Sequence, residues 1–177
     1  KIVNGIVATN YIPYQASIRV SIRDYARFGR GHTCGAVLVN SHTSITAAHC
    51  LMDGEKFRTP FDIHVVFGTL NRYIHTQDSR IGHVERIIVH PQYSRFQSFS
   101  DDIGIVIVSI IDRCSFKGDF LILIGKQLRR PVEFNAIIHS IPIIDYKVVE
   151  FTNCQVSGWG STEWQGVMPA DLFKANV

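Results

Sequence analysis

The chain has 177 residues, a net charge of +3, 46% hydrophobic residues and 19% charged residues. This composition is typical of a globular protein with a core, and it excludes the disordered and collagen-like classes. The longest apolar runs, 103–111 and 120–125, are shorter than the roughly 20 residues that span a bilayer, so we expect no transmembrane segment. No secretory signal is visible at the start, which indicates either an intracellular chain or a missing first segment.

Short runs rich in Val, Ile and Phe follow one another through the first 108 residues, and Gly, Asn, Pro or Asp separate them. This pattern predicts an all-β barrel or sandwich, and no helix of convincing period is present before residue 110. The predicted strands are 2–5, 14–23, 34–40, 44–50, 61–68, 83–90 and 102–108.

Four arginines, Arg19, Arg23, Arg27 and Arg30, fall at nearly helical spacing and could form a basic stripe that binds a polyanion. The same stretch alternates apolar and polar residues over 15–23, which is typical of a half-buried strand followed by a Gly-containing turn. We favour the strand, because the net charge is too small to predict nucleic-acid binding.

The sequence changes character at 109–127, where two apolar clusters flank a charged centre that contains Cys114. This segment could be a surface insertion, a partner-binding loop or intron sequence read as protein. We favour the last, because the motifs on both sides are intact while the apolar stretch 120–125 has no evident strand partner or period. Residues 128–143 resemble an extended linker, 148–161 a strand ending in a Gly-Trp-Gly turn, and 171–177 the start of another strand.

Cys34 and Cys50 bracket two strand-like runs joined by a polar turn. An antiparallel hairpin would bring the two cysteines together, and a disulfide closing about 15 residues is worth about 3 kcal/mol. The bridge would hold His49 rigidly, although a lone histidine at a strand end usually has a structural role. Zinc has no support from CxxC or HxxxH spacing.

Asp101 and Asp102 stand immediately before a run that resembles a buried strand. A carboxylate there is costly unless it is paired, and an imidazole is the nearest explanation. An Asp that accepts the Nδ1 proton of a histidine leaves Nε2 free to take a proton. The alternative is a simple turn aspartate.

Taken together, these motifs resemble the chymotrypsin-like (trypsin-fold) serine endopeptidases. The matching stretches are KIVNG (1–5), PYQAS (13–17), CGAVLVNSHTSITAAHC (34–50), HPQY (90–93) before DDIGIV (101–106), LRRPVEFN (128–135) and CQVSGWGS (154–161). The resemblance implies an all-β, two-barrel fold. In it, 2–108 would form an essentially complete first barrel and 109–127 an atypical insertion, while 128–177 would supply the linker and first strands of an incomplete second barrel.

The resemblance also implies roles for individual residues. His49 would be the general base, Asp102 the buried residue that orients it, and Lys1 and Ile2 the activation site of a secreted zymogen. Its partners would be protein or peptide substrates and protein protease inhibitors, with no nucleic acid, no membrane, no metal and no cofactor. Calcium is unsupported because 68–71 lacks an acidic residue where calcium-binding members begin their loop.

The family's nucleophile lies in a Gly-Asp-Ser-Gly-Gly motif that these residues do not contain. Gly118-Asp119 is followed by Phe120, and Ser157 and Ser161 belong to the Gly-Trp-Gly turn region. We therefore expect a serine endopeptidase fragment that is inactive by itself. The alternatives are a non-catalytic homologue acting as a binding or regulatory module, and a truncated product with no function.

Two further expectations concern the chain ends. Without the acidic partner beside the serine, an Ile2 ammonium would be a buried unpaired charge, so we predict that the first residues do not insert stably. Asn4, where the family usually has glycine, is a mild change because Asn tolerates left-handed dihedrals. Cys154 is expected to pair beyond Val177, with a Cys114–Cys154 bridge as the alternative.

Overall fold

The computed structural model describes residues 2–94, 101–111, 129–163 and 166–177. They form an almost entirely β structure, which confirms the predicted fold class. The elements are β1 (Ile6–Val7), β2 (Gln15–Val20), α1 (Ser21–Ala26), β3 (His32–Asn40), β4 (Thr43–Thr46), the 3-10 helix η1 (Ala48–Leu51), β5 (Met52–Asp53), β6 (Lys56–Phe57), β7 (Ile63–Phe67), β8 (Arg80–Val89), β9 (Gly104–Ile111), β10 (Arg129–Arg130), β11 (Gln155–Gly158) and β12 (Phe173–Asn176).

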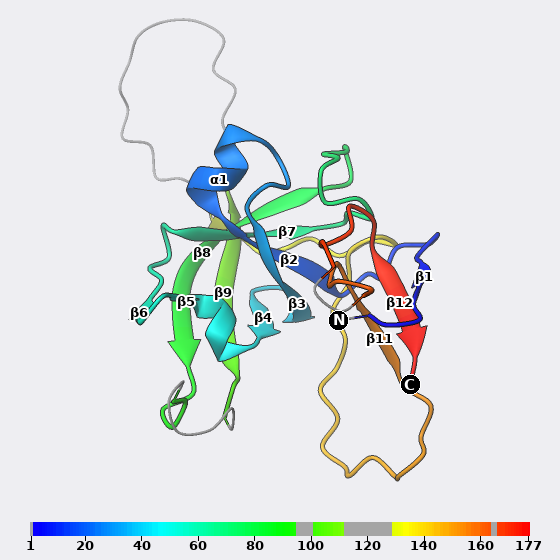
Figure 1. The fold of residues 1–177 in the computed structure, drawn as a ribbon. Coiled ribbons are helices and arrows are strands. Elements are labelled where there is room, and N and C mark those ends of the chain that lie inside the picture. Colours follow the sequence, from blue (N-terminus) through cyan, green and yellow to red (C-terminus); the bar gives the residue numbers. More distant parts are fainter. Residues whose placement is uncertain (1, 95–100, 112–128, 164–165) are drawn as a thin grey trace, which may run out of the picture.

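Six strands form a closed barrel in the order β9-β4-β3-β2-β7-β8 (Figure 1). The long antiparallel pairing of β8 with β9, from Gly82↔Ile110 to Val89↔Gly104, closes it. Closure leaves none of these strands with an unpaired edge, which removes a common route to aggregation. Every neighbouring pair is antiparallel, and alternate side chains of the strands fill the interior.

One apolar core fills the barrel. Its buried residues come from β2, β3, β7 and β9, and from η1 and the segment after β10 as well. Its members are Ala16, Ile18, Ala36, Leu38, Leu51, Ile63, Val65, Phe67, Val106, Val108, Val132 and Ile138.

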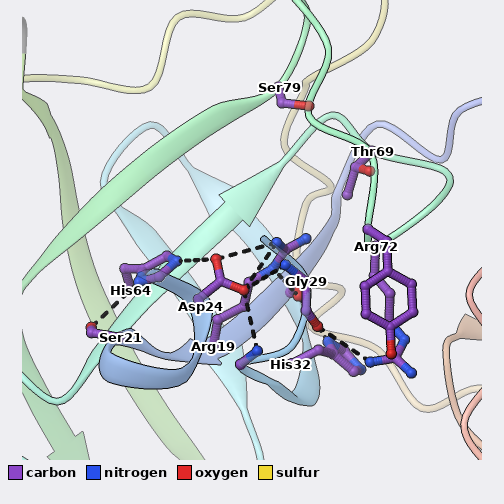
Figure 2. Close-up of polar contacts among 12 residues, drawn as sticks. Arg19, Ser21, Asp24, Gly29, His32, His64, Thr69, Arg72 and Ser79 are labelled. Carbon is purple, nitrogen blue, oxygen red and sulfur yellow. Dashed lines mark hydrogen bonds and ion pairs between the residues drawn. The ribbon is translucent and has the colours of Figure 1, made fainter. Parts of the chain in front are cut away.

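The strand predicted at 15–23 is confirmed over Gln15–Val20, but the prediction that it is half-buried is wrong, because all six residues of β2 are buried. Arg19 is completely buried and directs its guanidinium to Asp24, with Nη1 3.4 Å from each carboxylate oxygen. His64 of β7 lies on the other side of that carboxylate, with Nε2 3.0 Å from Oδ2. Figure 2 shows the Asp24 carboxylate between the two side chains. With Arg19 inside, the four arginines do not form a continuous basic stripe.

The expected strand ends early, because the chain forms the short helix α1 at Ser21–Ala26, and the Gly-containing turn follows this helix instead of the strand. Asp24 lies in this helix and accepts hydrogen bonds from the backbone N–H groups of Gly29 (2.7 Å) and Gly31 (3.2 Å). Gly29 has a φ of 86°, and a Cβ at this position would clash with the backbone of Arg72. The loop is therefore ordered by a buried charge that amphipathic periodicity does not reveal.

A second, smaller sheet lies beside the barrel and pairs β1, from near the start of the chain, with β12, from near its end (Figure 1). Its order is β1-β12-β11. We expected two strands from the C-terminal part, and β11 and β12 are those strands. The third is β1 at Ile6–Val7, which replaces the strand predicted at 2–5. Asn4 forms part of a turn with a φ of 58°, which confirms that Asn supplies the left-handed conformation.

Arg72 fastens the barrel to the segment that leads into β12. Its side chain donates to the carbonyls of Pro169 (2.9 Å) and Met168 (3.1 Å), and its backbone N–H donates to that of Ala170 (2.9 Å). Trp159, buried in the small cluster with Ala8 and Leu172, is also part of this junction. The two sheets are thus joined through backbone carbonyls, through the Trp159 side chain and through hydrogen bonds between side chains, such as Asn71 to Asp171.

Most of the atypical segment 109–127, including Cys114, lies outside the described residues. Its first three residues continue β9, which extends to Ile111. Within the described ranges, no helix is long and apolar enough to cross a membrane.

The first prediction concerns the buried ion pair. Replacing Asp24 with Asn should lower the free energy of unfolding by about 3 kcal/mol or more, because the Arg19 cation would stay buried without its counter-charge. Asp53→Asn is the matched control: its carboxylate is 3.6 Å from Arg58 but largely exposed, so little change is expected. Urea titration followed by circular dichroism measures both. Equal effects of the two substitutions would contradict the assignment.

The second prediction concerns His32, whose Nδ1 lies 2.8 Å from Ser17 Oγ. Burial, and then the charges of Arg72 and Arg19, lower the pKa of His32 from 6.5 to about 3. Between these values the unfolded chain binds a proton that the native chain does not, so the free energy of unfolding decreases as the pH falls from 6.5 toward 3.

His32→Gln should therefore flatten the acid side of the stability profile relative to the parent chain. Urea midpoints measured at half-unit steps from pH 4 to pH 7.5 test this. Parallel profiles for the two chains would show that His32 is not the group responsible.

Candidate functional site

His49 and Asp102 are brought together by the pairing of β4 with β9. Thr46 of β4 lies opposite Gly104 of β9, so the residues just after β4 meet those just before β9. His49 is in η1, which begins at Ala48, two residues after β4 ends. A Cβ at Gly104 would lie 2.5 Å from Leu51 Cδ1 and 3.6 Å from the Ala48 Cα. The bare backbone of this glycine allows η1 to pack closely over the start of β9.

The Asp102 carboxylate uses both oxygens on His49. His49 Nδ1 lies 2.7 Å from Oδ2, and the His49 backbone N–H donates to Oδ1 over 2.8 Å. Two bonds to one residue fix the rotation of the carboxylate as well as its distance. When Nδ1 carries its proton toward Asp102, Nε2 keeps a free lone pair.

The histidine–aspartate pair is more exposed than we expected for a buried aspartate. The Asp102 side chain is 22% exposed and that of His49 is 60% exposed. Burial raises the pKa of Asp102, but hydrogen bonds from the ring and backbone of His49 outweigh it and hold the pKa below its ordinary value. Asp102 is therefore an anion at neutral pH, as an orienting partner of an imidazole must be.

The predicted disulfide is confirmed, since Cys34 of β3 and Cys50 of η1 are bonded. Their Cα atoms are 5.9 Å apart, within the ordinary range for such a bridge. The bond ties η1 to β3, and the Asp102 contact ties the same helix to the residues before β9. His49 is thus held between a covalent link and an ionic hydrogen bond.

The sequence did not reveal that the His49 ring faces the sulfur of Cys50. Nε2 lies 3.4 Å from Cys50 Sγ, and the ligand atoms of Cys34, His49 and Cys50 all lie within 4.8 Å of one another. The only sequence signal is adjacency of a His and a Cys, which does not fix the direction of either side chain. Among the described residues, this is the group that could hold a metal, provided that its sulfurs are thiolates.

The described serines of the Gly-Trp-Gly region are engaged elsewhere. Ser157 Oγ donates to Gln15 Oε1 over 2.6 Å. Ser161 Oγ donates to the Glu163 carbonyl over 2.5 Å. The described partners of the His49 ring are Asp102 and Cys50, and neither is a serine hydroxyl.

The prediction that the first residues do not insert is wrong. Ile2 is 7% exposed, and its backbone N–H donates to the Ser161 carbonyl over 3.1 Å. The physical reason is that Lys1 precedes Ile2 in this chain, so the Ile2 nitrogen is a neutral amide. Burying it requires a hydrogen-bond acceptor and no counter-charge.

Comparisons with known proteins agree with this architecture. The family model described as Trypsin matches residues 2–177. A Bos taurus protein, the suppressor of tumorigenicity 14 protein homolog, is 32% identical over 173 residues, which cover 93% of this chain and 17% of that protein. A Xenopus laevis trypsin is 29% identical over 175 residues, or 98% of this chain and 56% of the trypsin.

The chain therefore spans just over half the length of the frog trypsin and about a sixth of the bovine protein. The match to the family model includes both the barrel and the small sheet. On this evidence the chain belongs to the trypsin family of chymotrypsin-like serine proteases.

Proposed function

We propose that this chain forms part of a serine endopeptidase, with His49 as the general base and Asp102 as the residue that orients it. The contact that carries the proposal is the 2.7 Å approach of Asp102 Oδ2 to His49 Nδ1. Family membership supports it, since trypsin-family proteases act on peptide bonds in proteins.

The chemistry of the pair follows from its geometry. Asp102 accepts the Nδ1 proton and so selects the tautomer whose Nε2 can take a proton from a serine hydroxyl. When that proton arrives, the carboxylate stabilises the resulting imidazolium. The His49 side chain is 60% exposed, but its Nε2 lies 3.4 Å from Cys50 Sγ, so a nucleophile would have to approach Nε2 beside this sulfur. These roles are those of the family's triad and are transferred to this chain by position.

These residues by themselves do not supply the nucleophile. The 177-residue sequence contains no Gly-Asp-Ser-Gly-Gly motif, and that motif also provides backbone N–H groups for the oxyanion hole. We infer that the chain alone is inactive and that the whole protease needs further sequence carrying the serine. A non-catalytic homologue also fits the missing motif, but it would have no need to keep the His49–Asp102 pair.

The remaining assignments belong to the same proposal. The whole protein would be secreted and activated by cleavage between Lys1 and Ile2. It would cleave protein or peptide substrates and be bound by protein inhibitors. We assign 2–108 to the first barrel, 109–127 to an atypical insertion, and 128–177 to the linker and first strands of the second barrel. In this division β1 contributes to the small sheet although it precedes the barrel strands.

A fluorophosphonate probe, which reacts with an activated serine, tests the inactivity of the chain. The purified 177-residue protein should not be labelled above a heat-denatured sample, because no serine is placed against His49 Nε2. Intact trypsin labelled in parallel is the positive control. Stoichiometric labelling, located by peptide mapping, would show that the chain holds its own nucleophile.

Proton NMR tests the His49–Asp102 contact directly in this chain. A short Nδ1–H···carboxylate bond should give a resonance far downfield of the amide region, and Asp102→Asn should abolish it. Asp101→Asn is the matched control, because the Asp101 carboxylate lies 3.7 Å from His90 Nδ1, whereas the carboxylate bound to His49 in the described structure is that of Asp102. A downfield resonance that survives in Asp102→Asn would exclude this hydrogen bond.

A further inference from the structure

A pocket of about 250 Å³ lies on the outer face of the barrel, at the end of β9 away from Asp102. Asp102 stands just before Gly104, where β9 begins, and Ser109, which lines the pocket, comes five residues after that glycine. A strand rises by about 3.4 Å per residue, so the two ends are about 17 Å apart. The pocket is therefore not part of the candidate site around His49.

A row of polar residues on neighbouring strands forms the floor of this pocket. His64 of β7 lies opposite His83 of β8, and His83 lies opposite Ser109 of β9. All three residues line the pocket. Val108 belongs to the barrel core, so the side chain of Ser109, the next residue, is directed to the outer face of the sheet.

The hydroxyl of Ser109 is a buried polar group for which the described structure has no partner. The residue is 2% exposed, and its Oγ has no hydrogen-bond partner among the described residues. Such a group costs free energy unless a water or a ligand satisfies it. Because a serine hydroxyl can rotate about χ1 and both donate and accept, it can bond a polar group that enters the pocket.

Tyr25 of α1 and Phe61, in the turn before β7, supply apolar surface to the same pocket. The two residues are 72% and 91% exposed. The Tyr25 ring stacks on His64 with centroids 5.8 Å apart, and Figure 2 shows that imidazole between Asp24 (3.0 Å) and Ser21 (3.3 Å). Tyr25 is thus held in place although most of it faces solvent. A ligand that covered both rings would remove apolar area from water.

Arg129 of β10 brings a positive charge to this pocket. Its side chain is 63% exposed, and Nη1 lies 3.3 Å from Glu85 Oε2. A guanidinium has five N–H donors in a fixed fork, so Glu85 can position it and leave donors for a second carboxylate. Arg129 lies opposite Ile111, two residues after Ser109, and such diagonal neighbours are about 7–8 Å apart. One ligand can therefore reach both side chains, and a cationic ligand would meet a like charge.

We propose that this pocket binds a carboxylate attached to an apolar group about the size of one ring. The carboxylate would pair with Arg129 and accept a hydrogen bond from Ser109, and the apolar group would lie against Tyr25 and Phe61. A few polar groups that converge on an apolar pocket are typical of small-ligand sites. A small free acid and the C-terminal residue of a polypeptide both offer this chemistry.

Amide chemical shifts of the ¹⁵N-labelled 177-residue chain measure binding and separate the two sources. N-acetylphenylalanine represents a polypeptide C-terminus, phenylacetate represents a small acid, and N-acetylphenylalaninamide is the uncharged control ligand. We expect saturable shifts at Ser109 and His83, with a Kd of about 1 mM or tighter for at least one acid. The amide should bind at least about tenfold more weakly than N-acetylphenylalanine. Tighter binding of N-acetylphenylalanine than of phenylacetate would assign a polypeptide C-terminus, and the reverse order a small acid.

Paired substitutions assign the contacts at the rim. Arg129→Gln should weaken binding of the acid by about tenfold or more, because it removes the charge that pairs with the carboxylate. Arg86→Gln, which changes an exposed arginine of β8 outside the pocket, is the matched control. Phe61→Ala should weaken binding by about threefold, whereas Phe57→Ala, 55% exposed and outside the pocket, should change the Kd by less than about twofold.

Ser109→Ala separates a ligand contact from a hydroxyl that is only part of the fold. Loss of a hydrogen bond to the carboxylate should weaken binding of the acid by about fivefold or more. An unchanged Kd would remove Ser109 from the site. Arg129 and Phe61 are exposed, so their variants should keep the parent spectrum. The proposal is overturned if no saturable shift appears in the pocket, if the amide binds as tightly as the acid, or if Arg129→Gln and Phe61→Ala bind like the parent.

Discussion

Strand β9 is the element on which the rest of this structure depends. It pairs with β8 on one edge to close the barrel and with β4 on the other, so it has no free edge along most of its length. The same pairing brings Asp102, just before β9, to His49, just after β4. Closure of the barrel and the approach of Asp102 to His49 thus depend on the same strand. A change that loosens β9 would affect both.

The barrel also buries an ion pair, and removing these two charges from water costs free energy. Arg19 and Asp24 are buried on β2 and α1, and one nitrogen of the arginine, Nη2, has no hydrogen-bond partner in the described structure. A buried ion pair is seldom more stable than a well-packed apolar alternative. What this pair does provide is order: Asp24 holds the loop through Gly29 and Gly31, and that loop contacts Arg72 at the junction with the small sheet.

The parts of the fold that could be predicted carry a local sequence pattern, and the parts that could not depend on contacts between distant residues. Alternating apolar residues and turn residues identified the barrel strands, and the spacing of Cys34, His49 and Cys50 identified the hairpin with its disulfide. The inward direction of Arg19 was not predictable, because its partner Asp24 follows in a short helix and is itself held by His64, which lies 40 residues after Asp24 on β7 within an apolar run. The pairing of β1 with β12 joins the two ends of the chain, and two-residue strands carry no periodic signal.

The described residues of the candidate site all come from one part of the structure, the barrel and the turns that flank its strands. His49, Asp102 and the disulfide all belong to the barrel, so their arrangement is complete without any contribution from the small sheet. In the function that we propose, the nucleophile would not come from this barrel, and the sequence has no Gly-Asp-Ser-Gly-Gly motif. His49 would then be an oriented base without a serine to deprotonate. The geometry of the histidine–aspartate pair follows from the pairing of β4 with β9 and does not by itself establish an activity.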